Sequence, residues 1–255
     1  MNGQGRPPHE VRWDDVAGRR VRSLRASRPG QDYAGRPRVV LVPGLGTLGY
    51  LISTLHGCSA WSQATLLDVP GFGHRRPLSS APVLPDVAAL TAEWLRSVCD
   101  GPAVLVGHST GAQVALHAAR AVPDRVAALI MAGPTFPPSL RTLAPLAPAI
   151  LRDLRYESPR LISVLWPYFV RGGPISMLRF IRSAQRDRPE DLITSVRSPV
   201  TVIRGEHDAF CPATWAGRLA ASAPDGQLVT VPGAHDFPYR HGGLTAAIAA
   251  QLRTV

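Results

Sequence analysis

The chain has 255 residues, of which 45% are hydrophobic and 18% charged, and a mass of 27.3 kDa. This length and composition suit one large domain, or one domain that carries an insertion. No apolar run approaches the roughly 20 residues that a membrane-spanning helix needs. The first ten residues are polar and lack the hydrophobic region of a secretory signal. We therefore expect a cytoplasmic protein with no membrane partner. Three cysteines without a C-x-x-C pair argue against a disulfide framework and against a zinc site.

The net charge of +10 comes from 28 arginines against 18 acids, because the chain contains no lysine. Two segments hold the excess: residues 1–38 have nine arginines against four acids, and residues 134–198 have ten against five. No nucleic-acid-binding motif accompanies this charge, and we do not expect the arginines to be interleaved with exposed aromatic residues. We therefore expect no nucleic-acid partner.

The first half of the chain alternates predicted strands with predicted helices. Residues 1–20 are expected to form a flexible arm, and Val21–Ala26 alternates weakly, as an edge strand does. Next come strands that are apolar on both faces, and helices with apolar residues three or four positions apart. The strands are Arg38–Val42, Thr65–Val69, Ala103–Val106 and Val126–Met131, and the helices are Pro85–Val98 and Thr110–Ala121.

The pattern changes between Pro134 and Pro199, where no strand is predicted and proline-broken helical pieces such as Ile175–Gln185 occur. Alternation then resumes, with strands at Val200–Ile203 and Leu228–Val231 and helices near Ala213–Ala221 and Gly243–Leu252. Alternation that is interrupted once indicates an α/β protein with a parallel sheet and a helical insertion. We expect a core of residues 21–133 and 197–255, and a helical cap of residues 134–196.

The sequence Gly107-His108-Ser109-Thr110-Gly111 fits the pattern G-x-S-x-G. It lies between a predicted buried strand and a predicted helix, which is where a nucleophile elbow occurs. Such a turn strains the serine backbone and exposes its hydroxyl at the carboxyl edge of the sheet. The two glycines lack side chains because strand and helix pass very close to each other there. Ser109 is therefore the candidate nucleophile.

A serine hydroxyl needs a base within hydrogen-bond reach, and the base needs an acceptor that orients it. His235 follows the strand Leu228–Val231 and is the preferred base, with His241 as the alternative. Asp208 follows the strand Val200–Ile203 and is the preferred acid. Glu206 and Asp236 compete locally with Asp208 but are expected to be solvated. The turn after Val126–Met131 contains no carboxylate, which excludes an acid there.

An acyl intermediate carries an oxyanion, which requires preorganised hydrogen-bond donors. The backbone N–H groups of Leu45, in Pro43-Gly44-Leu45-Gly46, and of Thr110, at the start of a helix, are the candidates. The partial positive charge at a helix N-terminus would add to their effect.

Taken together, these segments resemble the α/β-hydrolase fold superfamily, from about Val21 to Leu252. The matching pieces are Val42-Pro-Gly-Leu-Gly46, Asp68-Val-Pro-Gly-Phe-Gly73, Gly107-His-Ser-Thr-Gly111, Gly205-Glu-His-Asp208 and Gly233-Ala-His235. The resemblance implies an eight-stranded, mostly parallel sheet with helices on both faces and a helical cap inserted after the sixth strand. It also implies a triad of Ser109, Asp208 and His235, oxyanion donors at Leu45 and Thr110, and neither a cofactor nor a metal.

Two positions depart from the family pattern. Pro43 stands where the family usually has histidine, so the backbone donors remain but one side chain at the site is lost. Arg75 stands where a serine is common.

A serine nucleophile argues against epoxide and dehalogenation chemistry, which use a carboxylate at the elbow. The prediction is a serine hydrolase of the carboxylesterase or thioesterase type, acting on a small or medium ester, lactone or thioester. The alternatives are C–C bond hydrolysis of diketones and a non-hydrolytic biosynthetic or ligand-binding role.

The predicted cap is expected to roof the site. Most of its aromatic residues suit packing against the sheet, but Trp166, Phe169 and Phe180 are candidates for an apolar acyl pocket. Arg179, Arg182 and Arg186 share one helical face. They form either a solvated face or a site that attracts an anionic partner such as an acyl-CoA or an acyl carrier protein.

Overall fold

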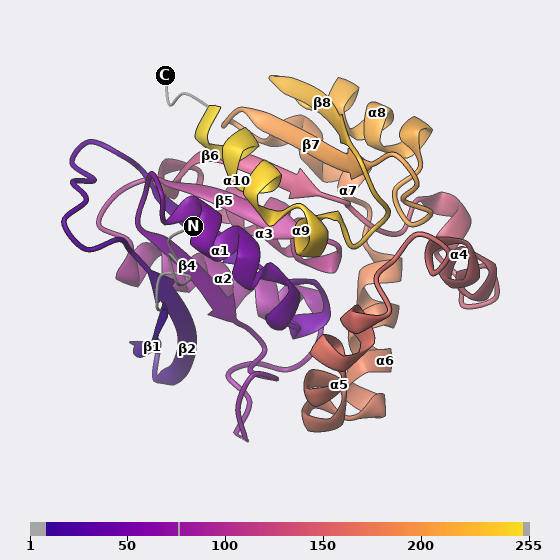
Figure 1. Ribbon diagram of the computed structural model, residues 1–255, viewed down its shortest axis with the longest axis horizontal. Coiled ribbons are helices and arrows are strands. Elements are labelled where there is room, and N and C mark those ends of the chain that lie inside the picture. The colour runs from indigo at the N-terminus through magenta and orange to yellow at the C-terminus, as the bar shows by residue number, and fades with distance from the viewer. Residues whose placement is uncertain (1–8, 76, 252–255) are drawn as a thin grey trace, which may run out of the picture.

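The computed structural model describes residues 9–75 and 77–251, and Figure 1 shows their arrangement. The first eight residues of the expected arm and the last residue of the last expected helix lie outside the described residues. Within them, eight strands form one sheet in the order β1-β2-β4-β3-β5-β6-β7-β8. The strands are β1 (His9–Val16), β2 (Arg19–Ala26), β3 (Arg38–Val42), β4 (Ala64–Asp68), β5 (Ala103–His108), β6 (Val126–Ala132), β7 (Val200–Gly205) and β8 (Gly226–Val231).

The sheet is antiparallel at one edge and parallel elsewhere. β2 pairs antiparallel with both of its neighbours, β1 and β4. From β4 onward every neighbouring pair is parallel, in the spatial order β4-β3-β5-β6-β7-β8. The mostly parallel eight-stranded sheet is therefore confirmed. Parallel strands place their carboxyl ends at the same edge. The loops after β3, β5, β7 and β8 consequently meet there.

Helices cover both faces of the sheet. They are α1 (Ile52–Cys58), α2 (Leu84–Val98), α3 (Thr110–Ala121), α4 (Leu146–Asp153), α5 (Arg160–Gly172), α6 (Pro174–Arg186), α7 (Pro189–Leu192), α8 (Ala213–Ser222), α9 (Phe237–Arg240) and α10 (Gly242–Gln251). Alternate residues of the central strands enter two separate cores. Val40 and Leu105 pack with α2, α3 and α8, while Leu41 and Val104 pack with α1 and α10. Figure 1 shows α1 and α10 in front of the sheet.

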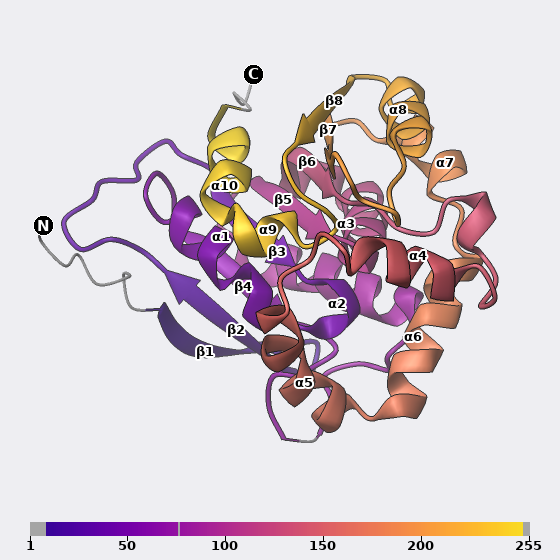
Figure 2. The same ribbon diagram turned by 45° about the vertical axis from the view of Figure 1, so that its right-hand side comes forward.

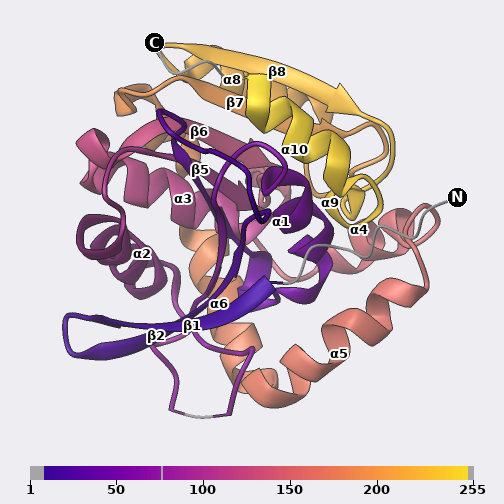
Figure 3. The ribbon, with the colours of Figure 1, turned by 60° about the vertical axis from the view of Figure 1, so that its left-hand side comes forward.

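The hairpin of β1 and β2 corrects the prediction of a flexible arm for residues 9–20, the part of that arm that the structure describes. β1 pairs with β2 along its whole length, from His9 opposite Ala26 to Val16 opposite Arg19. Ala17 and Gly18, both with positive φ, make the turn. Figure 3 shows this hairpin at the lower left. The sequence has no apolar alternation in β1 because nearly all of its side chains are exposed.

The segment between β6 and β7 consists of helices, so the predicted insertion after the sixth strand is confirmed. Its helices α4, α5 and α6 lie together at the right of Figure 1, and Figure 2 shows α4 in front of the ends of the central strands. Phe180 and Met177 of α6 are buried against the core. No helix in the described part of the chain is long and apolar enough to cross a membrane.

Candidate active site

Ser109 lies on a sharp turn between β5 and α3. Its backbone is in an unusual conformation, with φ 58° and ψ −128°. A side chain on Gly107 would collide with the backbone of Gly111, and one on Gly111 would collide with the carbonyl of Val42. The turn therefore tolerates glycine alone at these two positions, as expected for an elbow.

Asp208 and His235 face each other across the ends of β7 and β8. The Asp208 Oδ2 atom is 3.0 Å from Nδ1 of His235. The other oxygen, Oδ1, accepts hydrogen bonds from the backbone N–H groups of Phe210 and Cys211, at 2.9 and 2.8 Å. Gly133, at the end of β6, lies against this pair, since a Cβ there would be 3.1 Å from Asp208 Oδ2. The carboxylate is thus fixed by its own loop and directed at the imidazole.

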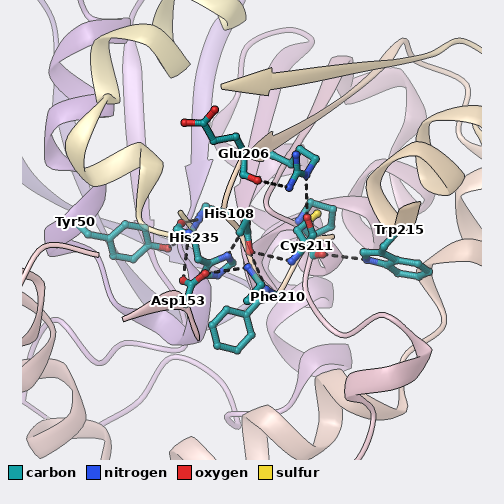
Figure 4. A network of polar contacts seen from close by, with 12 residues as sticks. Tyr50, His108, Asp153, Glu206, Phe210, Cys211, Trp215 and His235 are labelled. Carbon is teal, nitrogen blue, oxygen red and sulfur yellow. Dashed lines mark hydrogen bonds and ion pairs between the residues drawn. The ribbon is translucent and has the colours of Figure 1, made fainter. Parts of the chain in front are cut away.

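The backbone of His235 is held on both sides by buried side chains, as Figure 4 shows. Its N–H donates to Oδ2 of Asp153, at 3.2 Å. Its carbonyl lies 3.0 Å from Nε2 of His108. Asp153 is the last residue of α4 and only 1% exposed, and its Oδ1 also accepts from the N–H of Ala209, at 2.9 Å. One residue of the helical insertion therefore bonds to both the loop of Asp208 and the loop of His235.

A second network joins this histidine loop to the loop after β3. A carbonyl only accepts, so His108 Nε2 carries the proton that it donates to His235. His108 Nδ1 then accepts from the hydroxyl of Tyr50, at 2.8 Å, and this hydroxyl accepts from the N–H of Gly44, at 2.7 Å. Burial, together with the nearby charge of His235, keeps the pKa of His108 well below its usual value. Both residues thus stay neutral and rigid beneath Ser109.

The electrostatic environment favours a charged His235. Burial lowers its pKa, but the charge and hydrogen bond of Asp208 and the charges of Asp153 and Glu157 outweigh this effect and raise it to about 9. Burial, hydrogen bonding to Asp153 and the charge of Asp153 raise the pKa of Glu157 to about 8. Glu157 is therefore predominantly protonated near neutral pH.

A cavity of about 150 Å³ opens beside Ser109. Its lining residues, mostly apolar in the surface they present, are Gly44, Leu45, Thr47, Tyr50, His108, Ser109, Glu157, Leu161, Leu165, Phe169, His235 and Asp236. Within the described residues no hydrogen bond joins Ser109 to His235, and the hydroxyl of Ser109 has no other partner. Such bonds are often long without substrate and tighten when it binds. Ser109 and His235 therefore line the same cavity, and the Ser109 hydroxyl is available to a substrate there.

The three aromatic residues predicted to line the acyl pocket lie in three different environments. Phe169 lines the cavity. Trp166 is 62% exposed, because the inward face of α5 is formed by Leu161, Leu165 and Phe169 at spacings of four. Phe180 is fully buried in the core. Neither Trp166 nor Phe180 lines the cavity, which corrects the prediction for both.

The two predicted oxyanion donors lie side by side, but one of them already donates a hydrogen bond within the protein. The N–H of Leu45 donates to Oγ1 of Thr110, at 2.8 Å. Leu45 has φ 47° and ψ 26°, a region that favours glycine, so this hydrogen bond helps to hold a strained backbone. Thr110 begins α3 and is buried. The Leu45 N–H, predicted to bind an oxyanion, is therefore directed at the hydroxyl of Thr110 in this structure.

Two of the three competing candidates lie away from the cavity. His241 and Glu206 are exposed and do not line the cavity. Asp236, expected to be solvated, is instead buried and lines the cavity, and its Oδ2 accepts from the N–H of Ser158. No group of three or more His, Cys, Asp or Glu side chains in the described residues could hold a metal ion. The three cysteines are free and buried.

Comparisons with known proteins identify the family of the chain. Residues 39–248 match the sequence model of the Alpha/beta hydrolase family. The chain belongs to this family. A structural neighbour of this α/β hydrolase is a serine hydrolase involved in carbazole degradation, with a TM-score of 0.75 and 17% identity over 96% of this chain and all of the other.

Curated relatives of the α/β hydrolase include two proteins of different size. A pimeloyl-[acyl-carrier protein] methyl ester esterase of Xanthomonas axonopodis is 26% identical over 230 residues, covering 80% of this chain and 89% of the relative. The polyketide synthase ThaQ of Burkholderia thailandensis is 28% identical over 241 residues, covering 81% of this chain. The match spans only 11% of that synthase.

Replacing Asp153 by asparagine should disturb catalysis in two ways. Loss of its negative charge lowers the pKa of His235, so the rise of kcat/KM with pH should move to lower pH by roughly half a unit to one unit. The amide can accept from one of the two N–H groups but not from both, so kcat should also fall, by about tenfold. Ester hydrolysis between pH 6 and 10 measures both effects.

Asp191→Asn is the matched control for this substitution. Asp191 is an exposed carboxylate of the same insertion, in α7, and its loss should leave the pH profile unchanged. If Asp153→Asn lowers the rate but leaves the profile where it was, Asp153 supports the fold of the site without affecting His235 electrostatically.

Thr110→Val tests the hydrogen bond that holds Leu45. Valine has the shape of threonine but cannot accept, so kcat should fall by roughly tenfold or more, with little change in KM. Thr110→Ser keeps the hydroxyl and should stay near the wild-type rate. A faster Thr110→Val variant would contradict this expectation, since it would mean that the hydroxyl blocks the Leu45 donor.

Proposed function

We propose that this α/β hydrolase is a serine hydrolase that cleaves a small or medium carboxylic ester, lactone or thioester through an acyl-enzyme on Ser109. The observation that carries the proposal is a single cavity lined by Ser109 and His235, with His235 bonded to the buried carboxylate of Asp208. This combination of an activated hydroxyl, a base and an orienting acid is suited to acyl transfer.

The proposed reaction begins with attack of Ser109 Oγ on the substrate carbonyl while Nε2 of His235 accepts its proton. The resulting oxyanion is stabilised by the N–H groups of Leu45 and Thr110. His235 then gives the proton to the departing alcohol or thiol, which leaves the acyl group on Ser109. Water, deprotonated by His235, hydrolyses this ester and restores the enzyme.

The raised pKa of His235 gives this mechanism a defined pH dependence. The imidazole must be neutral to accept the Ser109 proton, and its pKa in the free enzyme is about 9. The value of kcat/KM is therefore expected to increase with pH and to level off above about 9. Asp208 stabilises the imidazolium that forms in the transition state.

An acyl-CoA or an acyl carrier protein is the proposed larger partner. The relative named as an esterase for a methyl ester on an acyl carrier protein supports this choice. Arg179, Arg182 and Arg186 line one groove of about 780 Å³ between α6 and the start of α2. This groove shares no lining residue with the cavity at Ser109, so it would contact the carrier rather than the reacting acyl group.

Labelling by a fluorophosphonate tests the nucleophile. Wild-type protein should gain the mass of one adduct, and Ser109→Ala should gain none, because only an activated serine reacts. A panel of an ester, a lactone, an acyl thioester and a vinylogous diketone then identifies the reaction class. Turnover of the diketone alone would move the assignment to C–C hydrolysis. Absence of an adduct would instead favour a non-hydrolytic role.

Replacing Arg179, Arg182 and Arg186 by glutamine tests the anionic partner. The value of kcat/KM should fall by about tenfold for an acyl-CoA or acyl carrier protein substrate and by less than twofold for a neutral ester, because guanidinium groups attract phosphate and carboxylate.

The control removes the same charge elsewhere, at the exposed residues Arg19, Arg28 and Arg36. It should leave both substrates unaffected at moderate ionic strength. Equal losses for the charged and the neutral substrate in the first variant would rule out a carrier site in this groove.

A further inference from the structure

The cavity at Ser109 adjoins a larger one, lined mainly by the helical insertion. The second cavity, of about 550 Å³, lies between α4 and α5. The two share four lining residues: Glu157, Leu161, Leu165 and Phe169. These shared side chains show that the two spaces adjoin.

The size of the first cavity limits what it can hold. A volume near 150 Å³ accommodates a group about as large as a benzene ring. This is enough for the reacting ester and a few carbons. A longer acyl group must extend beyond it, and the second cavity is more than three times as large.

The second cavity is suited to an apolar chain. Eight of its eleven lining residues are apolar: Ile150, Leu154, Pro159, Leu161, Ile162, Leu165, Phe169 and Phe210. The polar ones are Asp153, Glu157 and Ser158. The oxygens of Asp153 are occupied by the N–H groups of Ala209 and His235. Glu157 is predominantly uncharged near neutral pH, because its pKa is raised by burial and by Asp153. The carboxylate of Asp153 is therefore bonded to main-chain donors, and Glu157 adds little charge to this lining at neutral pH.

The far end of this space is open. Ile150, Leu154 and Ile162 line it and are 43%, 46% and 62% exposed. A closed pocket would set a fixed length for the acyl group, whereas an open end lets a chain extend toward solvent. The exposed apolar side chains around it would be covered by such a chain.

We propose that the space between α4 and α5, here called the acyl channel and lined as given above, binds the unbranched apolar chain of the substrate's acyl group. This inference rests on the proposed function, because it places the acyl chain of the substrate in the channel while the ester carbonyl lies at Ser109. The substrate class is accordingly an ester or thioester of a medium-chain fatty acid.

A series of p-nitrophenyl esters from acetate to decanoate tests the channel. Each methylene that leaves water for the channel contributes up to about a fourfold gain, so kcat/KM should rise at least tenfold between butyrate and decanoate. Ile162→Trp fills the channel from its open end. It should reduce kcat/KM for decanoate by about tenfold and change that for acetate by less than twofold.

Val170→Trp is the matched control, since Val170 lies on the same helix and is also 62% exposed but does not line the channel. It should affect neither ester. Decyl acetate, which carries the chain on the alcohol side, distinguishes the two ends of the substrate. If Ile162→Trp impairs decyl acetate rather than p-nitrophenyl decanoate, the channel binds the alcohol and the acyl assignment is wrong. A flat chain-length series would also overturn it.

Binding without turnover separates this inference from the proposed function. Calorimetric titration of Ser109→Ala with methyl decanoate and methyl butyrate should show at least tenfold tighter binding of the longer ester, and Ile162→Trp in the same background should abolish the difference. Equal affinities would refute the channel even if fluorophosphonate labels the wild-type protein. Chain-dependent binding without labelling would retain the channel and refute the hydrolase mechanism.

Discussion

The arrangement of the site depends on how the main chain of His235 is held. Its N–H is bound by Asp153 of the cap and its carbonyl by His108 of the elbow. These two side chains come from segments 45 residues apart in the chain. Because both are buried, each bond is strengthened by the absence of competing water. The imidazole orientation toward Ser109 and Asp208 therefore follows from three separate segments of the chain.

The same network extends to the strained loop after β3. His108 accepts from Tyr50, and Tyr50 accepts from Gly44, whose Cα lies so near Ser109 that a side chain would collide with it. Ser109 and Leu45 both have positive φ. Such conformations cost free energy and persist only when neighbouring bonds fix them. The hydrogen bonds from Gly44 and Leu45 supply this support at the point where the oxyanion would form.

Much of this arrangement could be predicted from the sequence. β3 and α3 have the predicted bounds, because a β-branched run and a regular apolar spacing are local signals. The Ser109 turn could be recognised because two glycines, a strand and a helix must coincide there. Asp208 and His235 followed from their positions after predicted strands, and the structure places their side chains 3.0 Å apart.

The residues that sequence reasoning missed make contacts over long distances along the chain. Asp153 bonds to residues 56 and 82 positions away, and no local pattern distinguishes it from an ordinary acid at a helix end. Phe180 shows the related difficulty for helical periodicity. The spacing of α6 indicates that one face is buried, but it does not tell whether that face meets the substrate or the core. Strand β1 was missed because an exposed edge strand needs no apolar alternation.

The role of Asp153 also bears on how a substrate reaches Ser109. Segment 153–158 is attached to the loops that carry the proposed acid and base, through Asp153, through Ser158 to Asp236, and through the stacking of Tyr156 on His207. Lifting this part of the cap would break the bonds that position His235. Entry by such a movement would therefore disassemble the site on each turnover. The opening between α4 and α5 lies beside this segment and avoids that cost, because an apolar chain can enter there while Asp153 stays bonded to both loops.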